Sequence, residues 1–208
     1  MATSVAAVAG LEEAGPAALR KLGSLASSRG WDADGLAAAI ALESRWNPTA
    51  RNSAGCVGLL QFCPVVLRSW GLSPETVLAM SAQRQLDLVE RYFGAWLSRG
   101  YTIGPRDWTA FALGAGNARP TDGPLPDETV LYEPGSPGAR GNPAIQDEDG
   151  AITMASARAA LGRVLAGAGG RRLPIPSASV ATAGAGLGGL AAALALATML
   201  HRRRRVRV

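Results

Sequence analysis

The stretch ALESRWNPTARNSAGCVGLLQF, residues 41–62, decides how this chain is interpreted. It places one acid, Glu43, at the end of an Ala- and Leu-rich run that is typical of a helix. Trp46 follows three residues later, and after it comes a polar loop with several glycines. A lone carboxyl between an apolar helix and such a loop needs a physical explanation.

The helix before the loop is expected over residues 33–44, with Asp32 or Asp34 as its N-cap. Its apolar face passes through Ile40, and Glu43 is the next position on that face. A carboxyl in this position is partly desolvated, which raises its pKa and keeps it protonated near neutrality. Such a group is a general acid of the kind that cleaves glycosidic bonds.

The remaining chain indicates a mainly α fold. Apolar periodicity predicts further helices over residues 4–28, 59–70, 74–98, 106–114 and 153–166. The first 120 residues show no convincing strand pattern. We expect a catalytic domain over residues 1–125, a Pro- and Gly-rich extension with a short helix over 126–166, and a linker over 167–177.

The C-terminal part predicts one transmembrane helix. Residues 178–200 carry no charged side chain, and as a helix they would rise about 34 Å, enough for a hydrocarbon core of about 30 Å. The segment is followed by a basic tail over residues 201–208. An Ala-rich helix packed on the domain is the alternative. At the N-terminus we find no pattern of a secretory signal peptide.

The formal charge of +5 comes from the tail. Without its five arginines, 16 basic side chains face 16 acidic ones, and the net charge is zero. This balance excludes a strongly basic, nucleic-acid-binding domain. The tail itself is typical of a segment that stays on the cytoplasmic side of a membrane.

Two cysteines, Cys56 and Cys63, form no zinc motif. If both lay on one helix, their separation would be about 10 Å of rise, too far for a disulfide. We therefore expect packed, inert thiols. A cysteine nucleophile would need a histidine, and the only one, His201, lies in the tail.

The loop residues resemble the soluble lytic transglycosylases (SLT), a family related to goose-type lysozyme. The family signature is ES, an aromatic residue, NP, a loop with Ser and Gly, and GLxQ. Its matches here are Glu43, Ser44, Trp46, Asn47, Pro48, Gly55, Gly58, Leu59 and Gln61. The continuation GLLQFCPVVL is similar to phage-type members, and the resemblance covers roughly residues 30–165.

The resemblance implies a lysozyme-like helical domain that cleaves peptidoglycan without cofactor or metal. Glu43 would protonate the oxygen between N-acetylmuramic acid and N-acetylglucosamine and then act as base on the muramoyl C6 hydroxyl. The product would be a 1,6-anhydro sugar. The implied substrate-binding residues are Ser44, Asn52, Ser53, Gln61, Gly114 and Asn117.

A second carboxylate would instead make the enzyme a muramidase-type hydrolase. The motif offers no such partner, but Asp32, Asp34 and Asp107 are left open as candidates.

Two positions depart from the family pattern. Asn52 stands where the family often has a serine, with Ser53 next to it. The family's later AYNAG motif is present only as AFALGAGNA, so the expected tyrosine hydroxyl is missing and Phe111 occupies that region. We expect these changes to affect the positioning of Glu43 more than the reaction itself.

A short acidic segment, QDEDGAIT over residues 146–153, is similar to half of a calcium loop. Ile145 and Ser156 stand at its two end positions, and neither is an adequate ligand. We interpret the segment around Asp147 and Asp149 as a turn without metal, and calcium binding there stays open.

Three function classes are consistent with the sequence: a membrane-tethered enzyme, a glycan-binding module whose catalytic site is inactive, and a small holin-like or structural membrane protein. Glu43 and Gln61 favour the enzyme. Expected partners are peptidoglycan glycan strands, membrane lipid, and a virion genome or other virion proteins at the arginine tail. We expect the protein in a phage virion with an internal membrane; the alternative is a cell-wall remodelling enzyme in a bacterial inner membrane, facing the wall.

Overall fold

The computed structural model describes residues 3–113 and 123–177 of the chain. These residues belong to the first compact unit of the chain, Met1–Ser177. The helices of the first unit are, in chain order, α1 (Gly15–Arg29), α2 (Ala33–Ser44), α3 (Pro64–Ser69), α4 (Pro74–Leu78), α5 (Ala82–Leu97), α6 (Trp108–Leu113), α7 (Pro137–Gly141) and α8 (Met154–Gly167). Its strands are β1 (Ser4–Ala6), β2 (Val130–Tyr132), β3 (Ile152–Thr153) and β4 (Arg172–Pro174).

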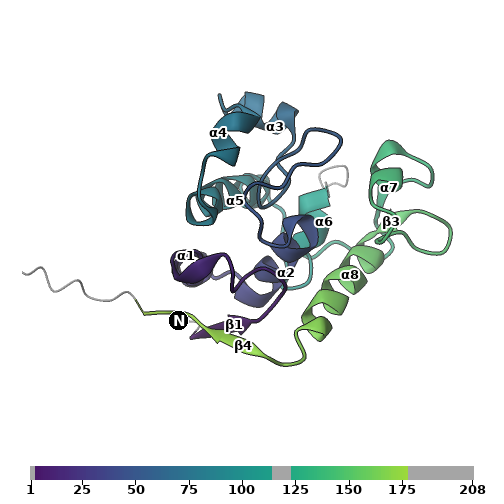
Figure 1. Ribbon diagram of the computed structural model, residues 1–208. Helices are drawn as coiled ribbons and strands as arrows, with labels where there is room; N and C mark the ends of the chain where they lie inside the picture. Colours follow the sequence, from purple (N-terminus) through teal and green to yellow (C-terminus); the bar gives the residue numbers. More distant parts are fainter. Residues whose placement is uncertain (1–2, 114–122, 178–208) are drawn as a thin grey trace, which may run out of the picture. The chain divides into compact units, whose positions relative to one another are not determined.

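Helix α2 is the centre of the core, and it packs against α1, α6, α8 and β1 (Figure 1). All residues from Leu36 to Ala41 are buried. Because most of them are alanines, neighbouring helices can approach α2 closely on several sides. A helix buried all round has little amphipathic character, which is the pattern of α2. Asp32 caps its N-terminus by accepting a 2.6 Å hydrogen bond from the Gly35 N–H.

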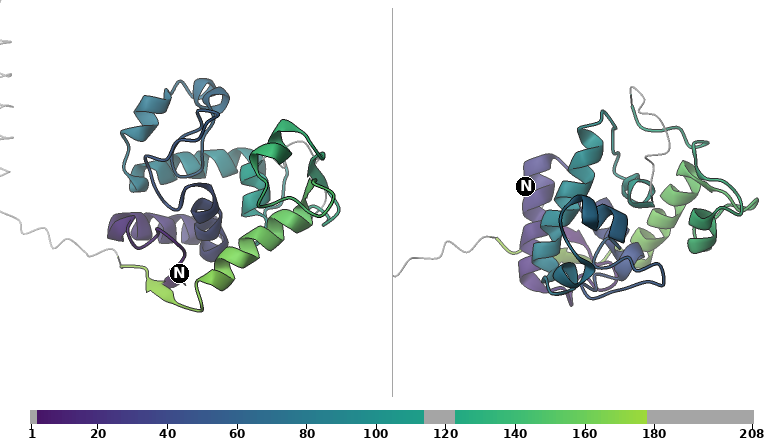
Figure 2. Two further views of the ribbon diagram at one scale, coloured as in Figure 1. Left: turned by 45° about the vertical axis from the view of Figure 1, so that its right-hand side comes forward. Right: turned by 90° about the horizontal axis from the view of Figure 1, so that it is seen from above.

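The two strands at the ends of the described chain pair with each other. β1 and β4 are antiparallel, with Val5 opposite Leu173, and they lie side by side in both Figure 1 and Figure 2. Arg172 donates hydrogen bonds to Asp34 and to Ser4. Residues 172–174 lie in the predicted linker, but they pair with β1 as a strand, and the Arg172 side chain binds the start of α2.

Several expected helices are confirmed and others are shorter than expected. α2 and α8 lie where periodicity predicts them. The run 74–98 divides into α4 and α5 because Ser81 caps the second helix through a hydrogen bond from the Arg84 N–H. The helix expected over 59–70 begins only at Pro64, because the residues before it pair as a hairpin. The start of the 4–28 run is strand β1.

The predicted fold class with a C-terminal transmembrane helix is corrected. No helix within residues 3–113 and 123–177 is long and apolar enough to cross a membrane. Helix α5 has 16 residues, a rise of about 24 Å, and it carries charges along one face. The segment 178–200 and the tail 201–208 lie outside the described residues. The structure is mainly helical, as a lysozyme-like domain would be.

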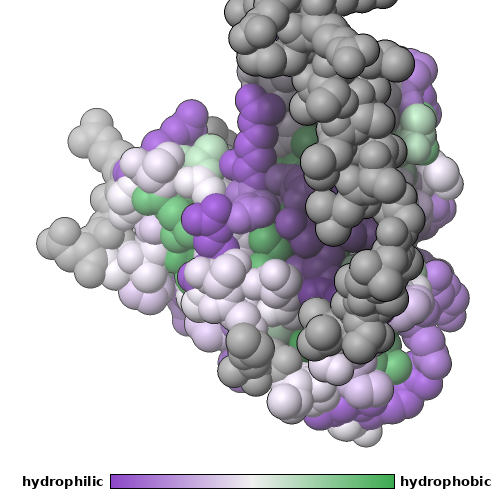
Figure 3. Space-filling view, turned by 90° about the vertical axis from the view of Figure 1, so that its left-hand side faces the viewer, coloured by the Kyte–Doolittle hydropathy of each residue, from purple (hydrophilic) through white to green (hydrophobic). Residues whose placement is uncertain are grey.

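The face of the molecule in Figure 3 carries both hydrophilic and hydrophobic residues. Hydrophobic residues form small separate patches among polar ones. Among the described residues, the large hydrophobic side chains that are exposed are Val65, Leu97 and Val130, and they lie on different elements. Scattered exposure of this kind is normal for a folded domain.

Candidate active site

Glu43 is half-buried at the end of α2. Glu43 lies in the last turn of the helix and is neither fully exposed nor sealed from solvent. Burial raises the pKa of its carboxyl from 4.5 to about 7. The carboxyl is thus substantially protonated at neutral pH, as a general acid requires.

The backbone turns sharply directly after Glu43. Arg45 and Trp46 both have positive φ, at 51° and 60°. Trp46 is buried and its indole N–H donates a 3.0 Å hydrogen bond to the Ala37 carbonyl. Gly10 packs against this turn, so closely that a Cβ added to Gly10 would lie 1.7 Å from the Arg45 carbonyl oxygen. Strained backbone held by surrounding packing is often found at functional sites.

The loop after this turn closes into a short hairpin. Val57 and Phe62 exchange two backbone hydrogen bonds of 3.1 and 2.8 Å. The tip between them, residues 58–61, holds Gly58 at φ 79° and Gln61 at φ 48°. We call residues 56–63 the site hairpin. Its tip is the GLxQ part of the motif quoted above.

Gln85 of α5 holds the site hairpin from behind. Its side chain is fully buried. The oxygen accepts a 2.8 Å bond from the Leu59 N–H, and the amide nitrogen donates to the carbonyls of Pro48 and Val77 at 2.7 and 2.9 Å. Gly58 lies against this group, since a Cβ there would be 2.4 Å from the Gln85 oxygen. Sequence patterns did not single out Gln85, because one buried glutamine in a helix has no spacing signature.

The predicted substrate-binding residues around Glu43 are mostly engaged in local hydrogen bonds. Ser44 donates to the carbonyls of Ile40 and Leu59, at 3.3 and 2.8 Å, and so ties α2 to the hairpin. Gln61 donates to the Gly58 carbonyl at 3.0 Å.

The exposed Asn52 accepts bonds from the N–H groups of Ala54 and Cys56. Ser53 is exposed beside it. Gly114 and Asn117 lie outside the described residues. The structure therefore brings Ser44 and the hairpin tip to the end of α2, and it places Asn52 and Ser53 on the outer turn of the loop.

Two tyrosines that sequence reasoning missed lie near Glu43. Tyr92 of α5 donates to the carbonyls of Phe111 and Ala112 at 3.2 and 3.4 Å. Tyr132 of β2 donates to the Leu113 carbonyl. Burial and, less strongly, the charge of Glu43 raise the pKa of Tyr92 to about 12 and that of Tyr132 above its usual range. Two phenol hydroxyls therefore flank the region where the motif lacks its tyrosine.

The candidate second carboxylates are engaged elsewhere. Asp32 caps the far end of α2, eleven residues and so about 16 Å from Glu43. Asp34 binds Arg172 at that same end. Asp107 is buried and accepts a 2.7 Å bond from Arg158. Burial alone accounts for the raised pKa of Glu43. These three acids are therefore not arranged as its partner.

The expectation of free thiols is wrong, because Cys56 and Cys63 form a disulfide. The expectation assumed a helix, in which the two residues would be far apart. The hairpin instead folds the chain back on itself, so that the two residues face each other. Cysteines one pair beyond a tight turn would have been a detectable signal for this pairing.

The acidic segment 146–153 forms a turn. Asp149 accepts a hydrogen bond from the Ala151 N–H at 3.0 Å, and the Asp147 N–H donates to the Ala151 carbonyl. Within the described parts of the chain, no group of three or more His, Cys, Asp or Glu side chains could hold a metal ion.

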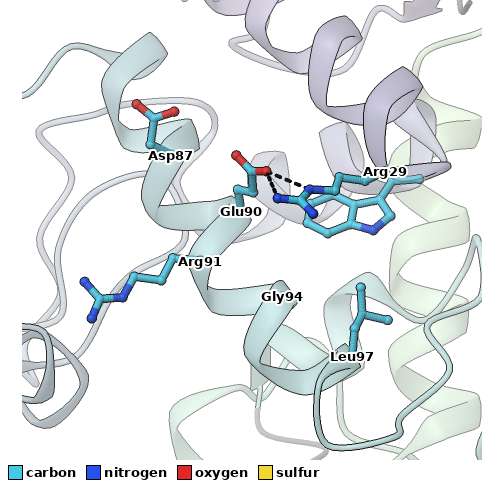
Figure 4. A pocket seen from close by; sticks show the side chains of 7 residues that line it. Arg29, Asp87, Glu90, Arg91, Gly94 and Leu97 are labelled. Carbon is cyan, nitrogen blue, oxygen red and sulfur yellow. Dashed lines mark hydrogen bonds and ion pairs between the residues drawn. The ribbon is translucent and has the colours of Figure 1, made fainter.

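A surface pocket is formed at the end of α1 and along α5 (Figure 4). It is lined by Arg29, Trp31, Asp87, Glu90, Arg91, Gly94 and Leu97. The Arg29 side chain donates a 2.7 Å hydrogen bond to Glu90 across it. Gly94 follows Tyr92 by two residues, about 200° around the helix. None of the residues that line the pocket belongs to the turn after α2 or to the site hairpin.

Comparison with known proteins identifies one family. Residues 23–84 match the family model described as Transglycosylase SLT domain. Neither the curated proteins nor the solved structures gave a significant match. The matched range contains α2, Glu43, the site hairpin and Gln61, and it supports a lysozyme-like SLT domain with peptidoglycan as substrate. It gives no support to a phage-type subtype or to membrane-lipid or virion partners.

Proposed function

We propose that this protein is a peptidoglycan lytic transglycosylase in which Glu43 is the catalytic acid and base. The observation that carries the proposal is the half-buried Glu43 carboxyl, with a pKa near 7, at the end of α2 inside the range that matches an SLT domain. A group that titrates near neutrality can both give and take a proton there.

In the first step the Glu43 proton moves to the glycosidic oxygen, and the bond from that oxygen to the muramoyl C1 breaks. The N-acetylglucosamine side leaves as an alcohol, and positive charge develops at C1. In the second step the muramoyl C6 oxygen bonds to C1 while its proton returns to Glu43. The carboxyl is regenerated and no water is consumed.

The contacts of the neighbouring residues support this use of a single carboxyl. The three acids considered as partners are bound to a helix end or to arginines. Hydrolysis by paired carboxylates needs a second acid within about 5 to 10 Å of the first. The hydroxyls of Tyr92 and Tyr132 each donate to a carbonyl at the end of α6, so their oxygens remain as acceptors near Glu43.

The test is digestion of purified peptidoglycan followed by mass spectrometry of the muropeptides. Anhydro-muropeptides are expected from the native chain, and none from Glu43→Gln, which keeps the shape of the side chain and removes the acid. Products with reducing ends would identify a muramidase-type hydrolase instead. Cleavage by Glu43→Gln at the native rate would refute the role of Glu43.

We also propose that the protein works outside the cytoplasm. Peptidoglycan lies there, and a disulfide such as Cys56–Cys63 persists in oxidising compartments. For delivery in a phage particle, the support is the GLLQF continuation of the motif. Proteomics of purified particles tests this route, and a bacterial cell-envelope enzyme would be absent from them.

A further inference from the structure

The disulfide occupies a defined place in the site hairpin. Val57 and Phe62 form a hydrogen-bonded antiparallel pair, because each N–H donates to the other's carbonyl. In an antiparallel ladder the next pair outward is non-hydrogen-bonded, and its side chains approach more closely. That next pair is Cys56 and Cys63, the two residues joined by the disulfide. The bond therefore closes the hairpin directly behind its tip.

The site hairpin contacts the candidate site on two sides. Its Leu59 carbonyl accepts the 2.8 Å hydrogen bond from Ser44, the residue next to Glu43. Its Phe62 ring packs edge-on against Tyr92, with ring centroids 6.2 Å apart. A shift of the hairpin would therefore change the surroundings of Glu43 both at the end of α2 and at the face of α5.

The two cysteine residues differ in exposure. Cys56 is 3% exposed, whereas Cys63 is half-buried. The Sγ of Cys63 also lies 3.7 Å from the Gln61 carbonyl oxygen. An external thiol or disulfide would thus reach the Cys63 sulfur first, next to the glutamine of the motif.

We propose that Cys56–Cys63 is a reversible redox modification site that sets the geometry of the site hairpin. With the bond formed, the disulfide and Gln85 both hold the tip. With the bond reduced, Gln85 and the Val57–Phe62 pair hold it alone, and the tip opens more often. The effect on catalysis rests on the proposed function, while the effect on the hairpin does not.

The oxidising partner is a disulfide, either a small one such as oxidised glutathione or that of a protein thiol–disulfide oxidase. The Cys63 thiolate attacks one sulfur of this partner and releases the other as a thiol, giving a mixed disulfide. The Cys56 thiolate then attacks the Cys63 sulfur and releases the second partner thiol. In sum two protein thiols are oxidised, one partner disulfide is reduced, and two partner thiols are formed.

This chemistry links activity to the compartment. A reducing cytoplasm favours the dithiol form and an oxidising exterior favours the disulfide. The chain would thus reach full activity only where peptidoglycan is present.

The experiment compares the full chain in its oxidised and dithiothreitol-reduced forms. Hydrogen exchange, read by mass spectrometry on peptides covering residues 56–63, reports the hairpin, and muropeptide release reports activity. Reduction is expected to speed exchange in this segment and to lower activity roughly five- to tenfold, because only the closed fraction is competent. Reoxidation with oxidised glutathione should restore both readouts.

The matched control is the Cys56→Ser/Cys63→Ser double variant. It should resemble the reduced native chain in both readouts and should not respond to dithiothreitol. If this variant fails to fold, the test rests on the native chain alone, by comparing hydrogen exchange and muropeptide release before reduction, after reduction and after reoxidation. Unchanged exchange and unchanged activity on complete reduction, verified by thiol titration, would overturn the proposal. An oxidised chain that cleaves no glycan but shows the exchange difference refutes the proposed function and leaves the redox site supported.

Discussion

The side-chain oxygen of Gln85 accepts a 2.8 Å hydrogen bond from the backbone N–H of Leu59, and this contact joins α5 to the tip of the site hairpin. The amide nitrogen of the same residue donates to the carbonyls of Pro48 and Val77. One fully buried side chain thus satisfies backbone groups from three segments. Buried polar groups that lose such partners are costly, so the position is open to a direct test.

Gln85→Leu is expected to destabilise the fold by about 3 kcal/mol or more, because it leaves a buried N–H and two carbonyls without their partner. Chemical denaturation measures the free energy of unfolding. Gln83→Leu is the matched control, since Gln83 lies on the same helix but is exposed, and it should change stability by less than about 0.5 kcal/mol. Equal effects of the two variants would show that Gln85 does not support the hairpin.

Gly58→Ala should be more damaging than Gly71→Ala, although both positions have positive φ, at 79° and 71°. A Cβ at Gly58 would lie 2.4 Å from the Gln85 oxygen, whereas one at Gly71 would meet no atom within 4 Å. Gly71→Ala therefore isolates backbone strain, at about 1 kcal/mol. Thermal unfolding of both variants gives the comparison, and similar losses would mean that contact with Gln85 is unimportant.

Much of the candidate site could be predicted because it lies in one continuous stretch. The helix that ends near Glu43 has an N-cap and a long apolar run, and burial of that run predicts the raised pKa of the carboxyl. The spacing from Glu43 to Gln61 then identifies the loop. Local sequence carries this information because the turn, the hairpin and the helix end are neighbours along the chain.

The parts that sequence could not supply depend on distant segments. Tyr92 and Tyr132 approach Glu43 only through the packing of α5 and β2 around α6, and neither belongs to a motif. Strand β4 was expected to be linker because its surroundings are rich in Gly and Pro, yet Arg172 has a partner 138 residues earlier in the chain, Asp34. The disulfide was missed because a helix was assumed where a hairpin forms.

The raised pKa of Glu43 predicts a pH-dependent cost in stability. Its pKa is 4.5 as a free side chain and about 7 when folded. The folded state therefore holds its proton more tightly between these values, and stability falls as pH rises from about 4.5 to 7. Glu43→Gln removes this cost, so it should stabilise the protein by about 2 to 3 kcal/mol at pH 8 and by much less at pH 5.

Urea unfolding of the native chain and the Glu43→Gln variant at both pH values measures this difference. Glu128→Gln, at an exposed position, controls for the loss of one negative charge. A Glu43→Gln effect that is the same at pH 5 and pH 8 would contradict the raised pKa. The same titration predicts that glycan cleavage declines as pH rises above about 7, because the acid form is lost.

Tyr132→Phe is expected to reduce glycan cleavage by about tenfold while costing about 1 kcal/mol of stability. The change removes the hydroxyl that binds the Leu113 carbonyl and the oxygen that lies near Glu43. Tyr92→Phe is the corresponding change on α5. It removes the hydroxyl that binds the Phe111 carbonyl and the phenol oxygen near Glu43. Rates of muropeptide release and thermal unfolding measure the two effects. Native activity in both variants would exclude the tyrosines from positioning Glu43.

Truncation tests whether β4 belongs to the domain. A chain ending at Ser177 keeps the first compact unit and should unfold at the same temperature as the full chain. A chain ending at Gly170 loses Leu173, which is 9% exposed, and Ile175, which packs against Gly23. Loss of this burial should cost at least about 2 kcal/mol.

Arg172→Ala in the chain ending at Ser177 separates the ion pair from the apolar contacts. Arg172 is 48% exposed and its pair with Asp34 is partly solvated, so its removal should cost only about 0.5 to 1 kcal/mol. Thermal and urea unfolding compare the stability of three proteins: the chain ending at Ser177, the same chain with Arg172→Ala, and the chain ending at Gly170. If the chain ending at Gly170 is as stable as the one ending at Ser177, the pairing of β1 with β4 does not hold the start of α2, and the domain ends before residue 171.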